Sequence, residues 1–369
     1  MQKRLLRAWG FRDRGGFRTS FRLCFSEADQ MPGLIMDRYL FMKDGIRYQV
    51  FSYQLLTAGM DRVFSTGQNW ELILKWLTEQ AVLCGYSDVA WEQTLVLRRN
   101  DVSVRKLEGL MAEEPCLLKT SGSETLTDVS IQIQSVIEGA PDISFSVNLI
   151  EGQKTGFFLD QSFNIALVIR YLQRQKKYLQ NRKLRILDLC CYMGQWSVHL
   201  ASHLHSWGLE AEVHLVDVSE LALQKAKSNV QTCGAEVFSY KKDVLDLASL
   251  AELQPASFDI VISDPPAFVK NKKDLAVGLA AYVKLNTQAF KLVAPGGLLV
   301  SCTCSGAVSL EDFREALRKA ALRSGQSHAH CLAYGGQGWD HPHLMSFTEA
   351  YYLKMVLHQV GAEPEEKAE

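Results

Sequence analysis

An acid followed by two prolines is the feature of this sequence best suited to chemistry. Asp264 opens the segment Asp264-Pro265-Pro266-Ala267-Phe268, and the two prolines fix the backbone torsion φ and hold the segment rigid. A rigid carboxylate can orient a planar nitrogenous group by hydrogen bonding, and a carboxyl can act as a general acid. We therefore predict that this loop presents Asp264 to a nucleobase or an amide. A turn that only ends a strand is the alternative.

Two cysteines lie further along the chain, in Ser301-Cys302-Thr303-Cys304-Ser305-Gly306. Carbon 5 of cytosine is too weak a nucleophile to attack a methyl sulfonium, but a thiolate that adds at carbon 6 turns it into a reactive enamine carbon. A free thiol has a pKa of about 8.5, so the site has to supply activation. From their positions we predict that Cys304 is the nucleophile and that Cys302 belongs to the core, with a buried, unreactive cysteine as the alternative for either. Asp264 would protonate or hydrogen-bond ring nitrogen 3 as a general acid.

These residues need a sheet to position them. From residue 162 onward helical and strand patterns alternate, which is typical of a doubly wound, mostly parallel α/β sheet with helices on both faces. In such a sheet ligands bind beyond the carboxyl ends of the strands. The five predicted strands span residues 184–188, 212–217, 236–240, 258–263 and 297–301.

Acids at the strand ends indicate the cofactor. Asp188 and Asp217 close the first and second strands, and Asp243 follows the third. Asp217 is suited to accept hydrogen bonds from both ribose hydroxyls of a nucleoside, and Asp243 from an adenine amino group. The loop after Asp188 carries one glycine, Gly194, which suffices where no phosphate has to be bound. This pattern favours S-adenosylmethionine (SAM) over NAD, with another nucleotide as the alternative.

Length and composition set the remaining expectations. A chain of 369 residues predicts two domains: an α+β domain over residues 1–150 and the α/β domain over 151–360, followed by a disordered acidic tail at 361–369. No apolar run is long enough to cross a membrane and the first residues do not resemble a secretory signal, so we expect a cytoplasmic protein with reduced cysteines. His199 and His203 have the spacing of metal ligands, but no further ligand completes a set, so no metal is expected.

The net charge of −1 means that nucleic acid would have to be bound by local basic clusters. The first 22 residues and the segment 270–273 are such clusters, with a solvated surface as the alternative reading for each. Phe268 or Tyr282 could stack on an extruded base. The predicted RNA contacts are Arg105, Lys106, Lys154, Phe268, Lys270 and Lys272.

Eight motifs together resemble the bacterial large-subunit ribosomal RNA cytosine-carbon-5 methyltransferases, a class I SAM-dependent family with a PUA domain, a central β-rich domain and a Rossmann-like catalytic domain. The resemblance implies that Cys304 is the nucleophile, that the substrate is ribosomal RNA and that residues 1–150 are the central domain. It also implies a SAM site made by Phe158, Asp160, Gln161, Asp188, Tyr192, Gly194, Asp217 and Asp243. The motifs are MPGLIMDRY (31–39), LLTAGMDR (55–62), DVSVRKLEG (101–109), EGQKTGFFLDQ (151–161), LDLCCYMGQWS (187–197), DPPAFVKNK (264–272), CTCSG (302–306) and DHP (340–342).

Three departures from that family keep alternatives open. The sequence starts just upstream of the segment that resembles the central domain, so the PUA module is expected to be absent. Gln195 stands where a second glycine is usual, and Ala267 stands where other cytosine methyltransferases carry a second cysteine. The alternatives are methylation of a guanine nitrogen without a covalent step, and a catalytically silent SAM-binding module in RNA processing. For the oligomeric state, a homodimer is one alternative.

Overall fold

The computed structural model describes residues 1–122, 125–153, 155–180, 182–246, 250, 252–347 and 350–361. The chain divides into two compact units, Met1–Ser162 with Gly338–Thr348 and Phe163–Gln337 with Glu349–Glu369. The division falls at Ser162 rather than at residue 150, and a segment near the C-terminus belongs to the first unit. The tail at 361–369 was predicted to be disordered, and its residues after Gly361 lie outside the described part of the chain.

The first unit is an α+β domain built on one sheet. Its strand order is β5-β4-β3-β2-β6-β7, with β1 paired to β2. β2 and β3 form a long antiparallel hairpin, with paired residues from Leu34↔Leu55 to Lys43↔Ile46. The elements are α1 (Gln2–Arg14), β1 (Phe21–Phe25), β2 (Leu34–Lys43), β3 (Ile46–Leu55), α2 (Ala58–Ser65), α3 (Asn69–Leu83), β4 (Thr94–Arg98), β5 (Cys116–Lys119), β6 (Val129–Ile133) and β7 (Ile143–Val147).

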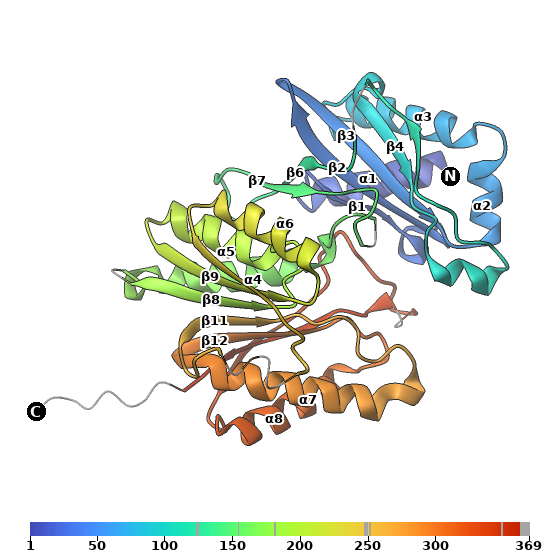
Figure 1. Cartoon of the computed structure of the whole chain (residues 1–369). Coiled ribbons are helices and arrows are strands. Elements are labelled where there is room, and N and C mark those ends of the chain that lie inside the picture. Colours follow the sequence, from blue (N-terminus) through green and yellow to red (C-terminus); the bar gives the residue numbers. More distant parts are fainter. Residues whose placement is uncertain are drawn as a thin grey trace, which may run out of the picture. The chain divides into compact units, whose positions relative to one another are not determined.

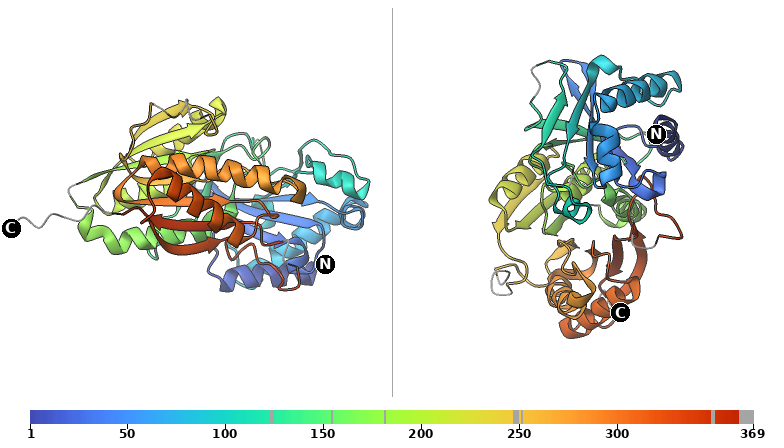
Figure 2. Two further views of the ribbon diagram at one scale, coloured as in Figure 1. Left: turned by 90° about the horizontal axis from the view of Figure 1, so that it is seen from below. Right: turned by 90° about the vertical axis from the view of Figure 1, so that its right-hand side faces the viewer.

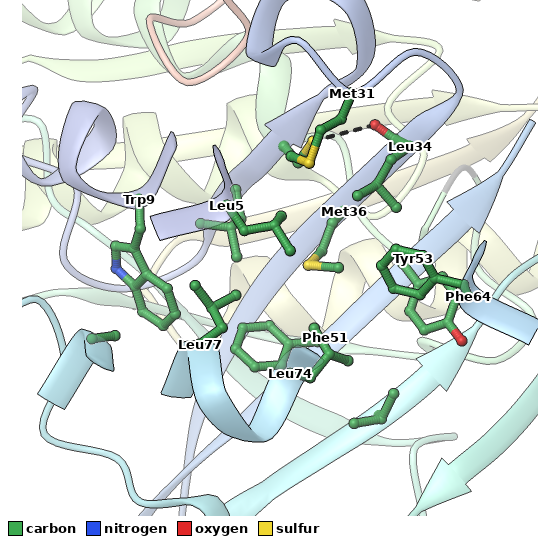
Figure 3. Close-up of a cluster of buried hydrophobic side chains, with 14 of the residues drawn as sticks. Leu5, Trp9, Met31, Leu34, Met36, Phe51, Tyr53, Phe64, Leu74 and Leu77 are labelled. Carbon is green, nitrogen blue, oxygen red and sulfur yellow. Dashed lines mark hydrogen bonds between the residues drawn. The ribbon is translucent and has the colours of Figure 1, made fainter. Parts of the chain in front are cut away.

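Its core is an apolar cluster between the sheet and the helices, and it includes residues of α1 (Figure 3). Leu5 and Trp9 on α1 are fully buried and lie against side chains of the strands and of α3. The basic residues of this segment obscured the helix in the sequence, because only one face of it is apolar. The first 14 residues are therefore part of the core of this unit as well as a basic run.

The second unit contains a seven-stranded sheet with the order β10-β9-β8-β11-β12-β14-β13. The five predicted strands are all present and run parallel. Of the two strands that were not predicted, β14 runs opposite to them, and β13, which pairs antiparallel with β14, runs in their direction. Figure 1 shows α7 and α8 on one face of the sheet and α5 and α6 on the other. The elements are α4 (Ser162–Gln175), β8 (Lys183–Leu189), α5 (Gln195–Ser206), β9 (Glu210–Asp217), α6 (Glu220–Gln231), β10 (Glu236–Lys241), β11 (Phe258–Ser263), α7 (Leu275–Leu292), β12 (Val293–Thr303), α8 (Leu310–Ser324), β13 (His330–Gly336) and β14 (Lys354–Gln359).

The central strands are buried on both faces. β8, β11 and β12 carry almost unbroken runs of buried residues, which is the pattern of parallel strands covered by helices on both sides. The helices α7 and α8 lie side by side over one face (Figure 2). The strand order reverses at β8, between β9 and β11, so the carboxyl ends of these three strands form the edge where a ligand is expected.

Candidate active site

The loop between β8 and α5 has a tight backbone. Cys190, Tyr192 and Gly194 have positive φ angles of 65°, 48° and 78°, a conformation that residues with a side chain rarely adopt. A Cβ at Gly194 would lie 3.2 Å from the Cβ of Ala226 on α6. The glycine therefore satisfies both the left-handed backbone and the close approach of α6, and the loop turns directly into the N-terminus of α5.

Asp217, the last residue of β9, holds this loop in place. Its carboxylate accepts hydrogen bonds from the backbone N–H of Tyr192, at 3.0 Å, and of Ser219, at 2.9 Å. A carboxylate oxygen can accept more than one hydrogen bond, so the half-buried side chain keeps acceptor capacity for ribose hydroxyls. Asp243, after β10, is exposed and accepts the N–H of Leu245 at 2.9 Å.

Asp188 is fully buried at the end of β8. Its Oδ2 accepts a hydrogen bond from Ser197 Oγ at 2.7 Å, and its Oδ1 has no hydrogen-bond partner among the described residues. Burial raises the pKa of Asp188 to about 7, the nearby Asp264 and Asp217 act in the same direction, and the Ser197 hydrogen bond opposes them. Unsatisfied buried carboxylate oxygens are rare, so Oδ1 is a candidate acceptor for a ligand donor.

Four carboxylates surround one turn of this loop. Burial raises the pKa of the Cys190 thiol well above its ordinary value, and the charges of Asp217, Asp264, Asp188 and Asp243 add to that effect. The thiol therefore stays protonated and is no nucleophile. The same electrostatic field favours a positively charged ligand group, such as a sulfonium or an ammonium.

Asp264 begins the loop after β11, and Trp196 fixes its side chain. The indole Nε1–H of Trp196, on α5, donates a hydrogen bond to Asp264 Oδ2 at 3.0 Å. The backbone N–H of Asp264 lies 3.4 Å from the carbonyl of Leu189, at the end of β8. Trp196 was not predicted as a site residue, and its only signal in the sequence is its place two residues after Gly194.

The structure brings Cys304 to the Asp-Pro-Pro loop. Cys304 follows β12 directly, is half-buried, and its Sγ lies 4.0 Å from the carbonyl oxygen of Pro265. Cys302 is fully buried and pairs with Met355 across to β14, which agrees with its predicted place in the core.

Tyr282, expected to stack on a base, is a buried support of this region. Its hydroxyl is hydrogen-bonded to Thr303 Oγ1 at 2.7 Å and to Ser305 Oγ at 2.9 Å, and it is fully buried. The half-buried ring of Phe268 packs on it with ring centroids 4.8 Å apart. Phe268 thus remains a candidate for stacking and Tyr282 does not, because no face of its ring is accessible.

The predicted cofactor residues 158–161 belong to the first unit. Phe158 is half-buried and precedes a short 3₁₀ turn, in which Asp160 and Gln161 are buried. The carbonyl of Asp160 accepts the N–H of Gly338 at 2.8 Å. The role of these residues in closing over SAM stays a prediction, and Lys154 lies outside the described residues.

The basic residues divide into exposed and buried groups. Lys106, Lys270 and Lys272 are exposed, which is compatible with phosphate contacts. Arg105 is only 1% exposed and forms ion pairs with acidic side chains, so the structure contradicts its prediction as an RNA contact. In the basic N-terminal run, Arg12 is likewise buried and forms a two-point ion pair with a carboxylate. These two guanidinium groups stabilise the fold.

SAM fits this set of residues. The crevice offers an unsatisfied buried acceptor at Asp188, an acceptor at Asp217 where a ribose is expected, and a negative field for the sulfonium. Asp188, Asp217 and Asp243 lie at or just after the carboxyl ends of the neighbouring strands β8, β9 and β10, and the strand order reverses at β8. The fold and the site define a class I SAM-dependent methyltransferase.

Comparisons with known proteins agree with this class and give the family. The family model "Methyltransferase domain" matches residues 180–350. The "Ribosomal RNA large subunit methyltransferase I" of Tolumonas auensis is 32% identical over 339 residues, 91% of this chain and 73% of the relative. That of Aeromonas hydrophila is 30% identical over the same shares. The chain belongs to the ribosomal RNA large subunit methyltransferase I family.

Solved structures show the same fold. A protein of Streptococcus mutans assigned as a SAM-dependent methyltransferase has a TM-score of 0.65 at 18% identity, covering 97% of this chain and 81% of the other. SMU.776, assigned as a methyltransferase and solved with SAH, has a TM-score of 0.63 at the same identity. At this identity they establish the architecture of both units.

The described residues contain neither a membrane-spanning helix nor a metal-binding cluster. No helix in that part of the chain is long and apolar enough to cross a membrane. No group of three or more His, Cys, Asp or Glu side chains there is arranged to hold a metal ion. His199 and His203 are buried, and the Nδ1 of His203 is hydrogen-bonded to the carbonyl of His199 at 2.7 Å.

Proposed function

We propose that this protein methylates carbon 5 of a cytosine in large-subunit ribosomal RNA, with Cys304 as nucleophile and Asp264 as general acid. The observation that carries the proposal is the placement of the Cys304 thiol 4.0 Å from the carbonyl of Pro265. A base held at the Asp-Pro-Pro loop would therefore have a thiol and a carboxyl beside it. The names of the relatives support ribosomal RNA as the substrate.

The residues have distinct tasks in this route. The Cys304 thiolate forms a bond from Sγ to carbon 6, and the π electrons of the ring shift so that nitrogen 3 takes the proton of the Asp264 carboxyl. Trp196 holds that carboxyl through its N–H. The product of this step is an enamine with nucleophilic carbon 5.

When bound, SAM supplies a methyl group on a sulfonium. Carbon 5 attacks that methyl group, and the methyl–sulfur bond breaks with its electron pair left on sulfur. A water molecule then removes the proton from carbon 5, those electrons restore the ring double bond, and Sγ leaves with the pair of the carbon 6–sulfur bond. Nitrogen 3 returns its proton to Asp264, so the enzyme is regenerated.

The exposed lysines suit the RNA backbone. Lys270 and Lys272 follow the Asp-Pro-Pro loop and are exposed, which supports a role for them in contacting phosphates that flank a base in the site. Lys106 is an exposed candidate in the first unit. We expect such contacts to set affinity, and the base edge at Asp264 to set specificity.

Mass spectrometry of nucleosides tests the proposal. Purified protein is incubated with SAM and with ribosomal RNA from cells lacking its gene, and the digest is searched for methylated nucleosides. New 5-methylcytidine supports the proposal, methylguanosine would replace it with direct transfer to a guanine nitrogen, and no product would favour a silent SAM-binding module.

A matched pair of variants tests the thiol step. Cys304→Ala is expected to abolish turnover, because no thiolate is left to add to carbon 6. Cys84→Ala, which changes an exposed cysteine of the first unit, is expected to be fully active. Retained 5-methylcytidine formation by Cys304→Ala would refute the covalent route.

A further inference from the structure

A buried lysine lies where β12 ends at the proposed nucleophile. Lys354 is the first residue of β14 and pairs with Thr303, the residue before Cys304. It is 2% exposed. Its Nζ donates hydrogen bonds to the carbonyl oxygens of Ser305 and Tyr352, each at 3.3 Å. Lys354 therefore contacts the residues on both sides of Cys304: its backbone pairs with Thr303, and its side chain is hydrogen-bonded to Ser305.

The ammonium group has no carboxylate partner among the described residues. Lysines are almost never fully buried unless they are paired, and an isolated buried charge is costly. Two of the three N–H donors go to the carbonyls, and the Tyr351 ring lies with its centroid 5.3 Å from Nζ. Burial lowers the pKa of Lys354 to about 8, and the negative charge of Cys304 acts in the opposite direction.

Two tyrosines near Lys354 and Cys304 remain neutral. Burial raises the pKa of Tyr351, and it also raises the pKa of Tyr282, whose hydroxyl contacts the residues on both sides of Cys304. Both phenols are therefore protonated around neutral pH. Among the charged groups of the described residues, Cys304 is the one whose negative charge acts on the Lys354 ammonium, whereas the Asp264 carboxyl of the same site is held by Trp196.

We propose that Lys354 is a positioning residue for Cys304, in which a buried ammonium beside the thiol stabilises the thiolate that adds to the base. The proton of the thiol passes to solvent, and the ammonium keeps its own. The thiol route requires such an activator, because the reacting form is the thiolate and burial alone favours the protonated thiol. This inference rests on the proposed thiol route.

The pH dependence of alkylation at Cys304 tests the proposal. Protein is treated briefly with iodoacetamide between pH 6 and pH 10, and modification of the Cys304 peptide is quantified by mass spectrometry in wild type, Lys354→Met and Lys354→Arg. We expect Lys354→Met to raise the midpoint by about one pH unit, which slows alkylation at pH 7 about tenfold. Lys354→Arg should retain most of the effect, because it keeps the positive charge.

The exposed Cys84 is the internal control. Its alkylation profile should be the same in all three proteins, since it lies in the first unit. Retention of SAM binding by Lys354→Met would show that the second unit is folded. An unchanged Cys304 midpoint in that folded variant would overturn the proposal, because a lysine that only caps two carbonyls would not alter the thiol.

A reciprocal measurement keeps the proposal testable if Lys354→Met does not fold. Coupling between two groups acts equally in both directions. We expect the Lys354 ammonium, followed by NMR of ¹³C-lysine and assigned by its loss in Lys354→Arg, to titrate at lower pH in Cys304→Ala than in wild type. An unchanged Lys354 midpoint would overturn the proposal.

The two proposals can fail separately. The alkylation profile of Cys304 and the NMR titration of Lys354 are both measured without RNA. If the two groups are coupled and Cys304→Ala still methylates RNA, the thiol route is rejected and the ion pair is not. An inactive Cys304→Ala without coupling would reject Lys354 as the activator and leave the thiol route in place.

Discussion

The buried carboxyl of Asp188 predicts how stability depends on pH. Burial raises its pKa from 3.8 to about 7 in the folded protein. Between these values the folded chain holds a proton that the unfolded chain has lost, so stability falls as pH rises through this window. At about 1.4 kcal/mol per pH unit, the full loss is at most about 4 kcal/mol and is complete above pH 7.

Asp188→Asn removes this titration and keeps the shape of the side chain. The amide oxygen can still accept the Ser197 hydrogen bond, and the buried amide N–H₂ costs about 1–3 kcal/mol at every pH. The difference in unfolding free energy between variant and wild type should therefore change with pH. We expect the variant to gain about 2–3 kcal/mol relative to wild type between pH 5 and pH 8.

Urea unfolding at pH 5, 6, 7 and 8 measures this difference. Other titrating groups are common to both proteins, so they cancel in the comparison. Parallel curves of unfolding free energy against pH would refute the reasoning, since they would mean that Asp188 is ionised in the folded state throughout. Because ionised Asp188 is the better acceptor for a cationic ligand, SAM should also bind wild type more tightly at pH 8 than at pH 6, and Asp188→Asn should lose that dependence.

Three further predictions concern single side chains. Trp196→Phe removes the N–H that holds the Asp264 carboxyl, a hydrogen bond worth about 0.5–1.5 kcal/mol. We expect kcat to fall about twofold to tenfold in the methylation assay with unchanged SAM affinity, and an unaffected kcat would contradict the role of Trp196. Gly194→Ala should lower the unfolding free energy by about 2–3 kcal/mol, from about 1 kcal/mol of backbone strain and the clash with α6. Its control is Gly208→Ala, where φ is +76° and no atom lies within 4 Å of the new Cβ, so only the strain should appear in the same urea titration. Arg105→Met should destabilise the first unit by about 1–3 kcal/mol because the backbone carbonyls of Leu55 and Met111 lose their hydrogen-bond donor. Lys106→Met should leave the melting temperature unchanged and weaken RNA binding, and equal effects of the two substitutions on stability would contradict the structural role of Arg105.

Much of the catalytic unit was predictable because its signals are local in the sequence. The runs that form β8, β9, β10, β11 and β12 are apolar and short, and acids close or follow the first three, so the parallel sheet and its ligand-binding edge follow from one general property of doubly wound sheets. The Asp-Pro-Pro segment and the Cys-Thr-Cys segment were likewise visible. The helix α1 was not, because its basic residues masked an apolar face that only packing reveals.

The sequence by itself determined the fold class, the strand ends that carry the acids and the residue types available for chemistry. Only the tertiary structure decided which of these residues are accessible. It buried Arg105, Tyr282 and Cys302, left Cys304 half-buried beside Pro265, and placed Trp196 against Asp264. The physical reason is that burial and contact depend on residues far apart in the chain: Lys354 reaches Cys304 because antiparallel β14 adds to the sheet beside β12, and no local pattern around either residue specifies that pairing.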